Sequence, residues 1–292
     1  MIHEFKIGDV SITRVCEYVG PTHDPAATYP AFERDTFERA VKQLPDGFYI
    51  PSMDKLVIAV NIWVVRKHDN IILVDAGVGN GKTRPAARMN RLNSLTLSWL
   101  EAAGATRHSV THVLLTHLHG DHIGWNTVKE NGTWEPTFPN AKYFVPSWDL
   151  SFFKENLAQG GSATSDGSMQ DSLLPIDDAG LLHHYAPGDE LAGCLDVVDA
   201  RGHTPGMANF WLHSKGEVGV FCSDVFHHPI QILNPNWNTA FCMLPEDAIA
   251  TRERFLEQAT KRSAMVMPCH FAGRGYGRIF RVPTGYSFAQ AP

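Results

Sequence analysis

Three histidines and one aspartate fall within six consecutive positions of this chain, in the pattern His117-x-His119-x-Asp121-His122. Neutral imidazole nitrogens and carboxylate oxygens are the ligands that zinc and similar divalent ions take from proteins. A bound divalent ion supports hydrolytic chemistry, because it lowers the pKa of water and polarises a carbonyl or phosphoryl oxygen. The segment therefore predicts a metal-binding loop, which we favour over four unrelated polar residues at a surface.

The residues before this segment predict the element that positions it. Val113–Leu115 is a short apolar run with a β-branched residue, typical of the end of a buried strand. His117 and His119 then point to the same side of an extended segment, because side chains alternate along it. After the turn that follows, the aspartate and the third histidine can approach the same point from another direction.

Three further residues that can bind metals each follow a predicted strand closely. The pairs of strand and residue are 195–199 with His203, 219–222 with Asp224, and 264–267 with His270. Loops at one end of a rigid sheet are where such sites are usually built. A catalytic zinc needs three protein ligands and a water, so seven ligands suffice for two ions.

A glycine-rich segment follows another predicted strand, 70–74, and begins with Asp75. It lacks the Lys-Ser/Thr pair of a phosphate-binding loop, so we predict no nucleotide site. Asp75 has two interpretations that stay open: it orients a metal-ligand histidine, or it only forms the turn.

The remaining pattern alternates strands with helices, which predicts an α/β chain with α and β elements layered around two sheets. The helices expected from apolar periodicity are 91–103, 148–157 and 245–262, and residues 126–139 are expected to be a polar, turn-rich connection.

The site motifs, taken in order and spacing, resemble those of the metallo-β-lactamase superfamily. The motifs are His117-x-His119-x-Asp121-His122, Gly202-His203-Thr204-Pro205-Gly206, Asp224 and His270, and the resemblance covers roughly residues 55–275. It implies an αββα sandwich of two similar halves, with two divalent metal ions, most simply Zn²⁺, in the cleft between the sheet ends.

The resemblance also implies the role of each ligand. His117, His119 and His203 would hold one ion, Asp121, His122 and His270 the second, and Asp224 would bridge them. A hydroxide shared by the two ions would attack the substrate, and Asp121 would carry a proton to the leaving alkoxide.

The chain has an aspartate at the bridging position, and in this it resembles the lactonase, glyoxalase II and organophosphate-hydrolase branches of the superfamily. The expected activity is opening of a small lactone or cleavage of an ester. The alternatives are hydrolysis of a phosphotriester or aryl ester, glyoxalase II-like thioester hydrolysis, and an iron-binding redox protein on the same scaffold. The intact set of seven ligands argues against the last of these.

His227 stands where quorum-signal lactonases commonly have a tyrosine, so an acyl homoserine lactone substrate stays open. Its imidazole could donate a hydrogen bond to a bound carbonyl, or it could be a supporting or solvent-facing histidine. Arg274, Arg278 and Arg281 could bind glutathione, but their spacing better suits an edge strand.

Aromatic residues are the candidates for the pocket wall, although for any single one a core position is the better interpretation. They are Phe32, Phe48, Trp125, Phe152, Phe153, Phe226 and Trp237. Apolar walls with few basic groups predict a small, neutral or hydrophobic substrate. The other histidines, His23 among them, are expected to be structural or at the surface.

The length, composition and charge of the whole chain limit which partners and which domain organisation are expected. It has 292 residues, 43% of them hydrophobic, and a formal net charge of −6, which argues against nucleic acid as a partner. We expect a single domain, 1–292, with an N-terminal strand and arm over 1–54 and a pocket-lining insertion over 151–190. The absence of a secretory signal and of a long apolar run, with five scattered cysteines, predicts a cytoplasmic protein without a membrane span. The oligomeric state stays open, with a homodimer as one option.

Overall fold

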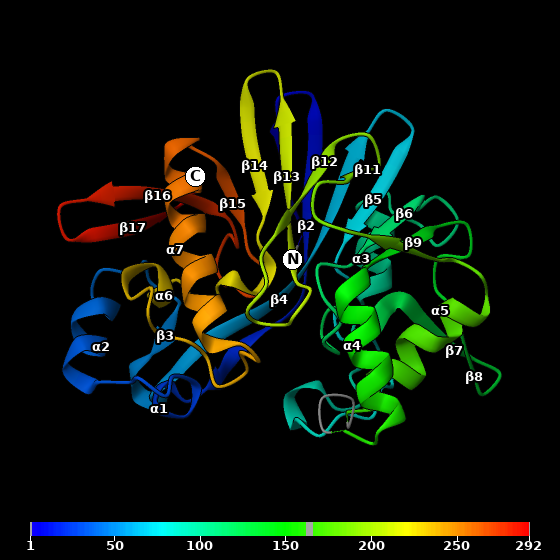
Figure 1. The fold of residues 1–292 in the computed structure, drawn as a ribbon, viewed down its shortest axis with the longest axis horizontal. Coiled ribbons are helices and arrows are strands. Elements are labelled where there is room, and N and C mark those ends of the chain that lie inside the picture. The colour runs from blue at the N-terminus through cyan, green and yellow to red at the C-terminus, as the bar shows by residue number, and fades with distance from the viewer. Residues whose placement is uncertain (1, 162–165, 292) are drawn as a thin grey trace.

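The computed structural model describes residues 2–161 and 166–291, and two β-sheets packed face to face form its centre (Figure 1). The first sheet has the strand order β1-β2-β4-β5-β6-β9-β10, with β3 paired to β4. Its strands are β1 (Ile2–Ile7), β2 (Val10–His23), β3 (Tyr49–Ile50), β4 (Lys55–Lys67), β5 (Asn70–Val74), β6 (His112–Leu114), β9 (Lys142–Pro146) and β10 (Leu182–Tyr185).

The second sheet follows the chain order from β11 to β17. Its strands are β11 (Glu190–Leu191), β12 (Leu195–Asp199), β13 (Ala208–Ser214), β14 (Glu217–Phe221), β15 (Met265–Met267), β16 (Gly277–Val282) and β17 (Gly285–Gln290). The helices are α1 (Pro25–Thr28), α2 (Arg34–Val41), α3 (Thr96–Ala102), α4 (Ser147–Ala158), α5 (Leu174–Asp178), α6 (Ile230–Leu233) and α7 (Pro245–Lys261).

Alternation along β4 explains why the two sheets pack as they do. Trp63 and Val65 point into the core between the sheets, whereas Ile62 and Val64 point to the opposite face and pack in a core that includes Leu100 of α3. Successive side chains of a strand face opposite sides, so an unbroken apolar run needs cover on both faces. Helix α7 covers the outer face of the second sheet in the same way (Figure 1). The predicted αββα sandwich is confirmed.

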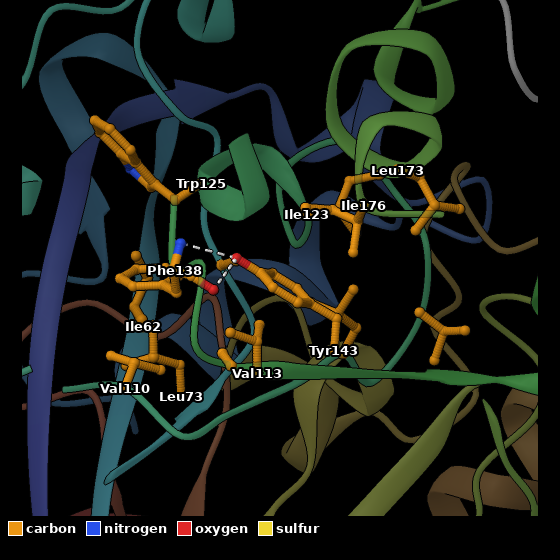
Figure 2. Close-up of a cluster of buried hydrophobic side chains, with 14 of the residues drawn as sticks. Ile62, Leu73, Val110, Val113, Ile123, Trp125, Phe138, Tyr143, Leu173 and Ile176 are labelled. Atoms are coloured by element: carbon orange, nitrogen blue, oxygen red, sulfur yellow. Dashed lines mark hydrogen bonds between the residues drawn. The ribbon is translucent and has the colours of Figure 1, made fainter. Parts of the chain in front are cut away.

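The outer core of the first sheet anchors the end of the histidine-rich segment. Figure 2 shows this core, in which the hydroxyl of Tyr143 accepts a hydrogen bond from the backbone amide of Phe138 at 3.0 Å. Ile123 and Trp125 follow His122 almost directly and are fully or almost fully buried in the same core. The metal-binding loop is therefore tethered to packed side chains immediately after its last predicted ligand.

The polar, turn-rich connection expected over 126–139 contains a turn, but it also contains two strands that were not expected. The segment contains a hairpin of β7 (Thr127–Glu130) and β8 (Thr133–Pro136), joined by Asn131 and Gly132. Both turn residues have positive φ angles, +50° and +89°. Asn-Gly is a strong sequence signal for this kind of two-residue turn, so the hairpin could have been predicted.

Two other expectations need correction. The helix expected over 91–103 begins only at Thr96, because Arg91 has a φ of +51° and the side chain of Asn80 bonds both backbone groups of Ser94. The strand expected around 274–281 exists as β16, but β17 pairs with it on its outer side, so β16 is not an edge strand. Among the residues that the structure describes, no helix is long and apolar enough to cross a membrane.

A buried cluster of charges ties a short helical turn, η5 (Met169–Leu173), to the loop after β5. Asp171 accepts a bidentate pair from Arg84 at 2.7 and 2.8 Å, and lies 3.6 Å from the ammonium of Lys82. Both cationic side chains are fully buried, and the ammonium of Lys82 also lies 3.6 Å from the ring centre of Trp134. Residues 162–165 of the predicted pocket-lining insertion lie outside the described residues.

We expect Asp171→Ala to lower the free energy of unfolding by about 3 kcal/mol, because it leaves two buried cations without their carboxylate. The matched control is Asp177→Ala, which removes a half-exposed pair with Lys154 and should cost less than about 1 kcal/mol. Denaturant unfolding of both variants measures the difference. Equal losses would show that the buried cluster does not stabilise the fold.

Candidate metal centre

The structure brings all seven predicted ligands together at the ends of four strands. The histidine-rich segment follows β6, His203 follows β12, Asp224 lies in the short turn η6 (Ser223–Val225) after β14, and His270 follows β15. Among the described residues, three groups of side chains have ligand atoms close enough to hold a metal ion, and Asp121 belongs to none of them. The groups are His117, His119 and His203; His122, Asp224, Cys269 and His270; and His203, Asp224 and His227.

Asp224 lies between the two sets of predicted ligands. Its Oδ2 is 3.2 Å from Nε2 of both His203 and His270, and its Oδ1 is 3.3 Å from Nε2 of His122. Asp121 is more distant, with carboxylate oxygens 3.9 Å from Nε2 of His122 and 3.8 Å from Nε2 of His270. The central position of Asp224 suits a carboxylate that is shared by two ions.

Two observations show that the residues fit metal ions. Nε2 of His117 is buried and has no hydrogen-bond partner among the described residues, although buried polar atoms are nearly always satisfied. Burial, aided by neighbouring imidazoles, lowers the pKa of His119 to about 3 and that of His117 well below its usual value. These imidazoles are therefore neutral, as metal ligation requires.

The other half of the site has the opposite electrostatics. Burial lowers the pKa of His270, but Asp224, Cys269 and Asp121 together outweigh it, and the pKa rises to about 10. Burial also disfavours the ionised form of Asp121, but His122 and His270 outweigh it and hold the pKa at about 2. The two aspartates thus stay ionised and favour positive charge at this end of the cluster, as a divalent cation supplies.

Asp75 makes the orienting contact that was one of its two interpretations. Its Oδ2 is 2.9 Å from Nδ1 of His122, and its Oδ1 accepts hydrogen bonds from the amide and hydroxyl of Thr116 at 2.8 and 2.9 Å. That hydroxyl also bonds the hydroxyl of Ser223, next to Asp224, at 2.6 Å. Asp75 therefore holds the Nε2 of His122 toward the predicted metal.

Sequence reasoning missed a second buried carboxylate, Asp149 in the first turn of α4. It accepts hydrogen bonds from the hydroxyl of Thr204 at 2.7 Å and from the amides of Gly206 and Leu118 at 2.5 and 3.3 Å. It thus joins the loop of His203 to the loop of His117. Burial raises its pKa to about 6. No sequence signal separates it from an ordinary acidic residue at a helix start.

A cavity of about 340 Å³ opens beside the predicted ligands. Its lining residues are Tyr18, Thr22, His23, Thr28, Ile58, Val60, Val78, Arg88, Met89, His119, Gly120, Asp121, Asp166, His203, Asp224, His227, Phe241 and His270. None of the seven aromatic candidates is among them, because these side chains pack in the cores instead. The aromatic wall is formed by Tyr18 and Phe241. His23, which was expected to be structural or at the surface, also lines the cavity.

His227 lies within the cluster rather than facing solvent. Its Nε2 is 3.1 Å from Oδ2 of Asp224, and its ring stacks on that of His270 with centres 5.4 Å apart. Its Nδ1 is buried without a hydrogen-bond partner among the described residues. Cys269 is also part of the cluster, where sequence analysis had seen only a scattered thiol.

Comparison with known proteins identifies the family. The model of the metallo-beta-lactamase superfamily matches residues 57–270, which is most of the chain. The protein therefore belongs to the metallo-beta-lactamase superfamily. Within this family, the cluster of histidines and aspartates forms a site that fits two metal ions.

Two solved structures share the fold along nearly their whole length. AidC, a dizinc quorum-quenching lactonase in complex with the product N-hexanoyl-L-homoserine, has a TM-score of 0.82 and 20% identity. AbOPH, a hydrolase in the beta lactamase superfamily, has a TM-score of 0.82 and 23% identity. Each match covers 100% of this chain and 97% of the other.

A curated relative adds little about activity. The uncharacterized protein YobT of Bacillus subtilis (strain 168) is 28% identical over 154 residues. The match covers 52% of this chain and 56% of YobT, so the chain matches about half the length of this relative.

We expect Asp75→Asn to weaken binding of one of the two metal ions by about 10–100-fold, because His122 loses its anionic partner. Asparagine tolerates the left-handed backbone of this position, where φ is +57°, so the fold should persist. Chelator competition measures the affinity, and Asp69→Asn, in the exposed turn after β4, is the matched control. Equal metal affinities in the two variants would contradict the orienting role.

Proposed function

We propose that this protein is a dinuclear metal hydrolase that opens a small lactone or cleaves an ester. One observation carries the proposal: the cluster of predicted ligands borders a cavity with a largely apolar wall. Ile58, Val60 and Val78 contribute to that wall, with Tyr18 and Phe241 as its aromatic members. A pocket of a few hundred Å³ with apolar walls and a few convergent polar groups is typical of a small-molecule site.

The residues that would hold the ions are those implied by the sequence. His117, His119 and His203 would bind one ion, Asp121, His122 and His270 the other, and Asp224 both. Nitrogen and oxygen ligands of this kind suit Zn²⁺. Two such ions lower the pKa of bound water towards neutrality and polarise a carbonyl oxygen. Asp75 and Asp149 keep the loops that carry the ligands in place.

Asp121 is proposed to move the proton. Its carboxylate lines the cavity and is ionised, so the oxygen that does not hold the ion can accept the proton released when water attacks the substrate. The same group can then deliver that proton to the leaving alkoxide. Its position beside Nε2 of both His122 and His270 would keep it at the reacting centre throughout.

His227 is proposed to contact the substrate or to hold Asp224. It lines the cavity, and its bond to Oδ2 of Asp224 leaves Nδ1 as the remaining polar atom of the ring. A neutral imidazole has a single N–H, which either bonds Asp224 from Nε2 or, in the other tautomer, donates from Nδ1 to a bound carbonyl. Burial lowers its pKa, which favours the neutral form.

The glyoxalase II alternative has weaker support. Arg274, Arg278 and Arg281 contact His3, Ser263 and Tyr286 respectively, and none of the three lines the cavity. A phosphotriester or aryl ester would use the same cavity and the same ions, so these substrates belong in the same test.

A hydrolysis panel tests the proposal. It contains acyl homoserine and aromatic lactones, aryl esters, a phosphotriester, a glutathione thioester and a β-lactam, and we expect the highest kcat/KM with a lactone or carboxylic ester. His119→Ala should lower that kcat/KM at least 100-fold, and chelation should abolish the activity until zinc is restored. His184→Ala, an exposed histidine on β10, is the matched control. Hydrolysis that survives both chelation and His119→Ala would contradict the proposal.

Two further variants in the same panel test the roles of individual side chains. Asp121→Asn should lower kcat, because an amide cannot accept the proton, and full turnover with both metals retained would exclude the shuttle. His227→Phe should raise KM if the ring contacts substrate, and should instead reduce metal content if it holds Asp224. A variant with unchanged kinetics and unchanged metal content would exclude both roles.

A further inference from the structure

One cationic side chain of the cavity has no part in the proposed chemistry. Among the described residues that line the cavity, Arg88 is the only arginine or lysine. It belongs to the short turn η2 (Ala87–Met89), and the next residue, Met89, packs against the core residues Val60 and Val78. The backbone bond from the amide of Met89 to the carbonyl of Ala86, 2.9 Å, closes the turn. Arg88 therefore sits on a fixed part of the cavity wall.

The guanidinium of Arg88 makes no hydrogen bond or ion pair with any described residue, unlike that of Arg84 in the same loop, which has a bidentate carboxylate partner. A guanidinium carries five donors in a planar fork that matches a carboxylate. In a cavity wall, those donors are available to a ligand.

His23 provides a second polar group on the wall. Its Nδ1 lies 2.8 Å from the hydroxyl of Thr22, and its Nε2 has no partner among the described residues. Burial first, and then the nearby charge of Arg88, lower the pKa of His23 to about 3, so the ring is neutral. Its ring also meets that of Phe241 edge-on at 5.9 Å. A free imidazole nitrogen thus accompanies the free guanidinium.

Asp166, an acidic residue of the same wall, forms no ion pair with Arg88. Asp166 lines the cavity, but its Oδ1 accepts hydrogen bonds from the amide and hydroxyl of Ser168 at 3.0 and 2.7 Å. Among the described residues, the carboxylate of Asp166 does not pair with the guanidinium of Arg88. The remaining acids of the cavity, Asp121 and Asp224, belong to the predicted metal cluster.

We propose that Arg88, assisted by His23, binds a carboxylate of the substrate that lies away from the bond to be cleaved. The substrate would then be a lactone or ester that is apolar along its length and carries one carboxylate at its far end. This inference rests on the proposed function, and it replaces the expected neutral substrate with a largely hydrophobic one that carries a single anionic group. A charge-assisted, bidentate contact in a largely apolar cavity is strong enough to select for such a group.

Matched pairs of carboxylic acids test the inference by binding, without turnover. The pairs are butyrate with succinate, pentanoate with glutarate, and hexanoate with adipate, each titrated into the metal-loaded protein. One carboxylate of each acid can bind at the metal cluster, so only the diacid has a second carboxylate for Arg88. We expect at least one diacid to bind 10-fold or more tightly than its monoacid, which is about 1.4 kcal/mol.

Variants of Arg88 test whether its side chain causes the difference in affinity between diacid and monoacid. Arg88→Met should reduce the diacid-to-monoacid ratio to about one and leave monoacid binding unchanged, and Arg88→Lys should restore part of it. Arg91→Met is the matched control, because Arg91 is an exposed arginine of the same loop that does not line this cavity. Thermal melting checks that each variant is folded.

Three outcomes would overturn the inference: no diacid binds more tightly than its monoacid, the ratio survives in Arg88→Met, or no carboxylic acid binds at all. Failure of the hydrolase proposal looks different, because it appears as absence of turnover in the panel of lactones and esters. A preserved diacid ratio without turnover would leave Arg88 as an anion-binding residue and reject only the proposed reaction.

Discussion

The buried carboxylate of Asp75 is the interaction on which the arrangement of the site depends most. It follows β5 of the first sheet, bonds Thr116 after β6, and pairs with Nδ1 of His122 at 2.9 Å. Through the hydroxyl of Thr116 it also reaches Ser223, which belongs to the second sheet's side of the site. The side chain of Asp75 therefore fixes the relative positions of predicted ligands from both halves of the sandwich. The backbone of Asp75 is left-handed, with a φ of +57°, and is therefore locally strained.

A second buried acid, Glu17, fixes a loop of the cavity wall in the same way, by accepting hydrogen bonds from its backbone. Glu17 accepts hydrogen bonds from the amides of Val78 and Gly79 at 2.6 and 3.1 Å, and from the indole of Trp125 at 2.5 Å. Burial raises the pKa of Glu17 to about 7. A Cβ at Gly77 would lie 2.2 Å from this carboxylate, so the chain needs glycine there. The wall residue Val78 is thus fixed by its backbone, which leaves its side chain free to line the cavity.

The sequence predicted the parts of the structure that depend on local pattern. Apolar runs located the strands, and polar residues just beyond them located the predicted ligands, because strand ends meet at the same edge of a sheet. Contacts between distant segments could not be read in this way. Thr204, for example, is a partner of Asp149 from 55 positions away. The aromatic pocket candidates failed for a related reason: composition does not distinguish a ring that packs in a core from one that lines a cavity.

This cluster of histidines and aspartates should hold two metal ions. Anomalous X-ray scattering from crystals of the purified protein would give the element, the number and the position of the ions. We expect two zinc-like peaks per chain, one beside His117, His119 and His203 and the other beside Asp121, His122 and His270, with Asp224 between them. A single iron peak, or peaks away from these residues, would contradict this expectation.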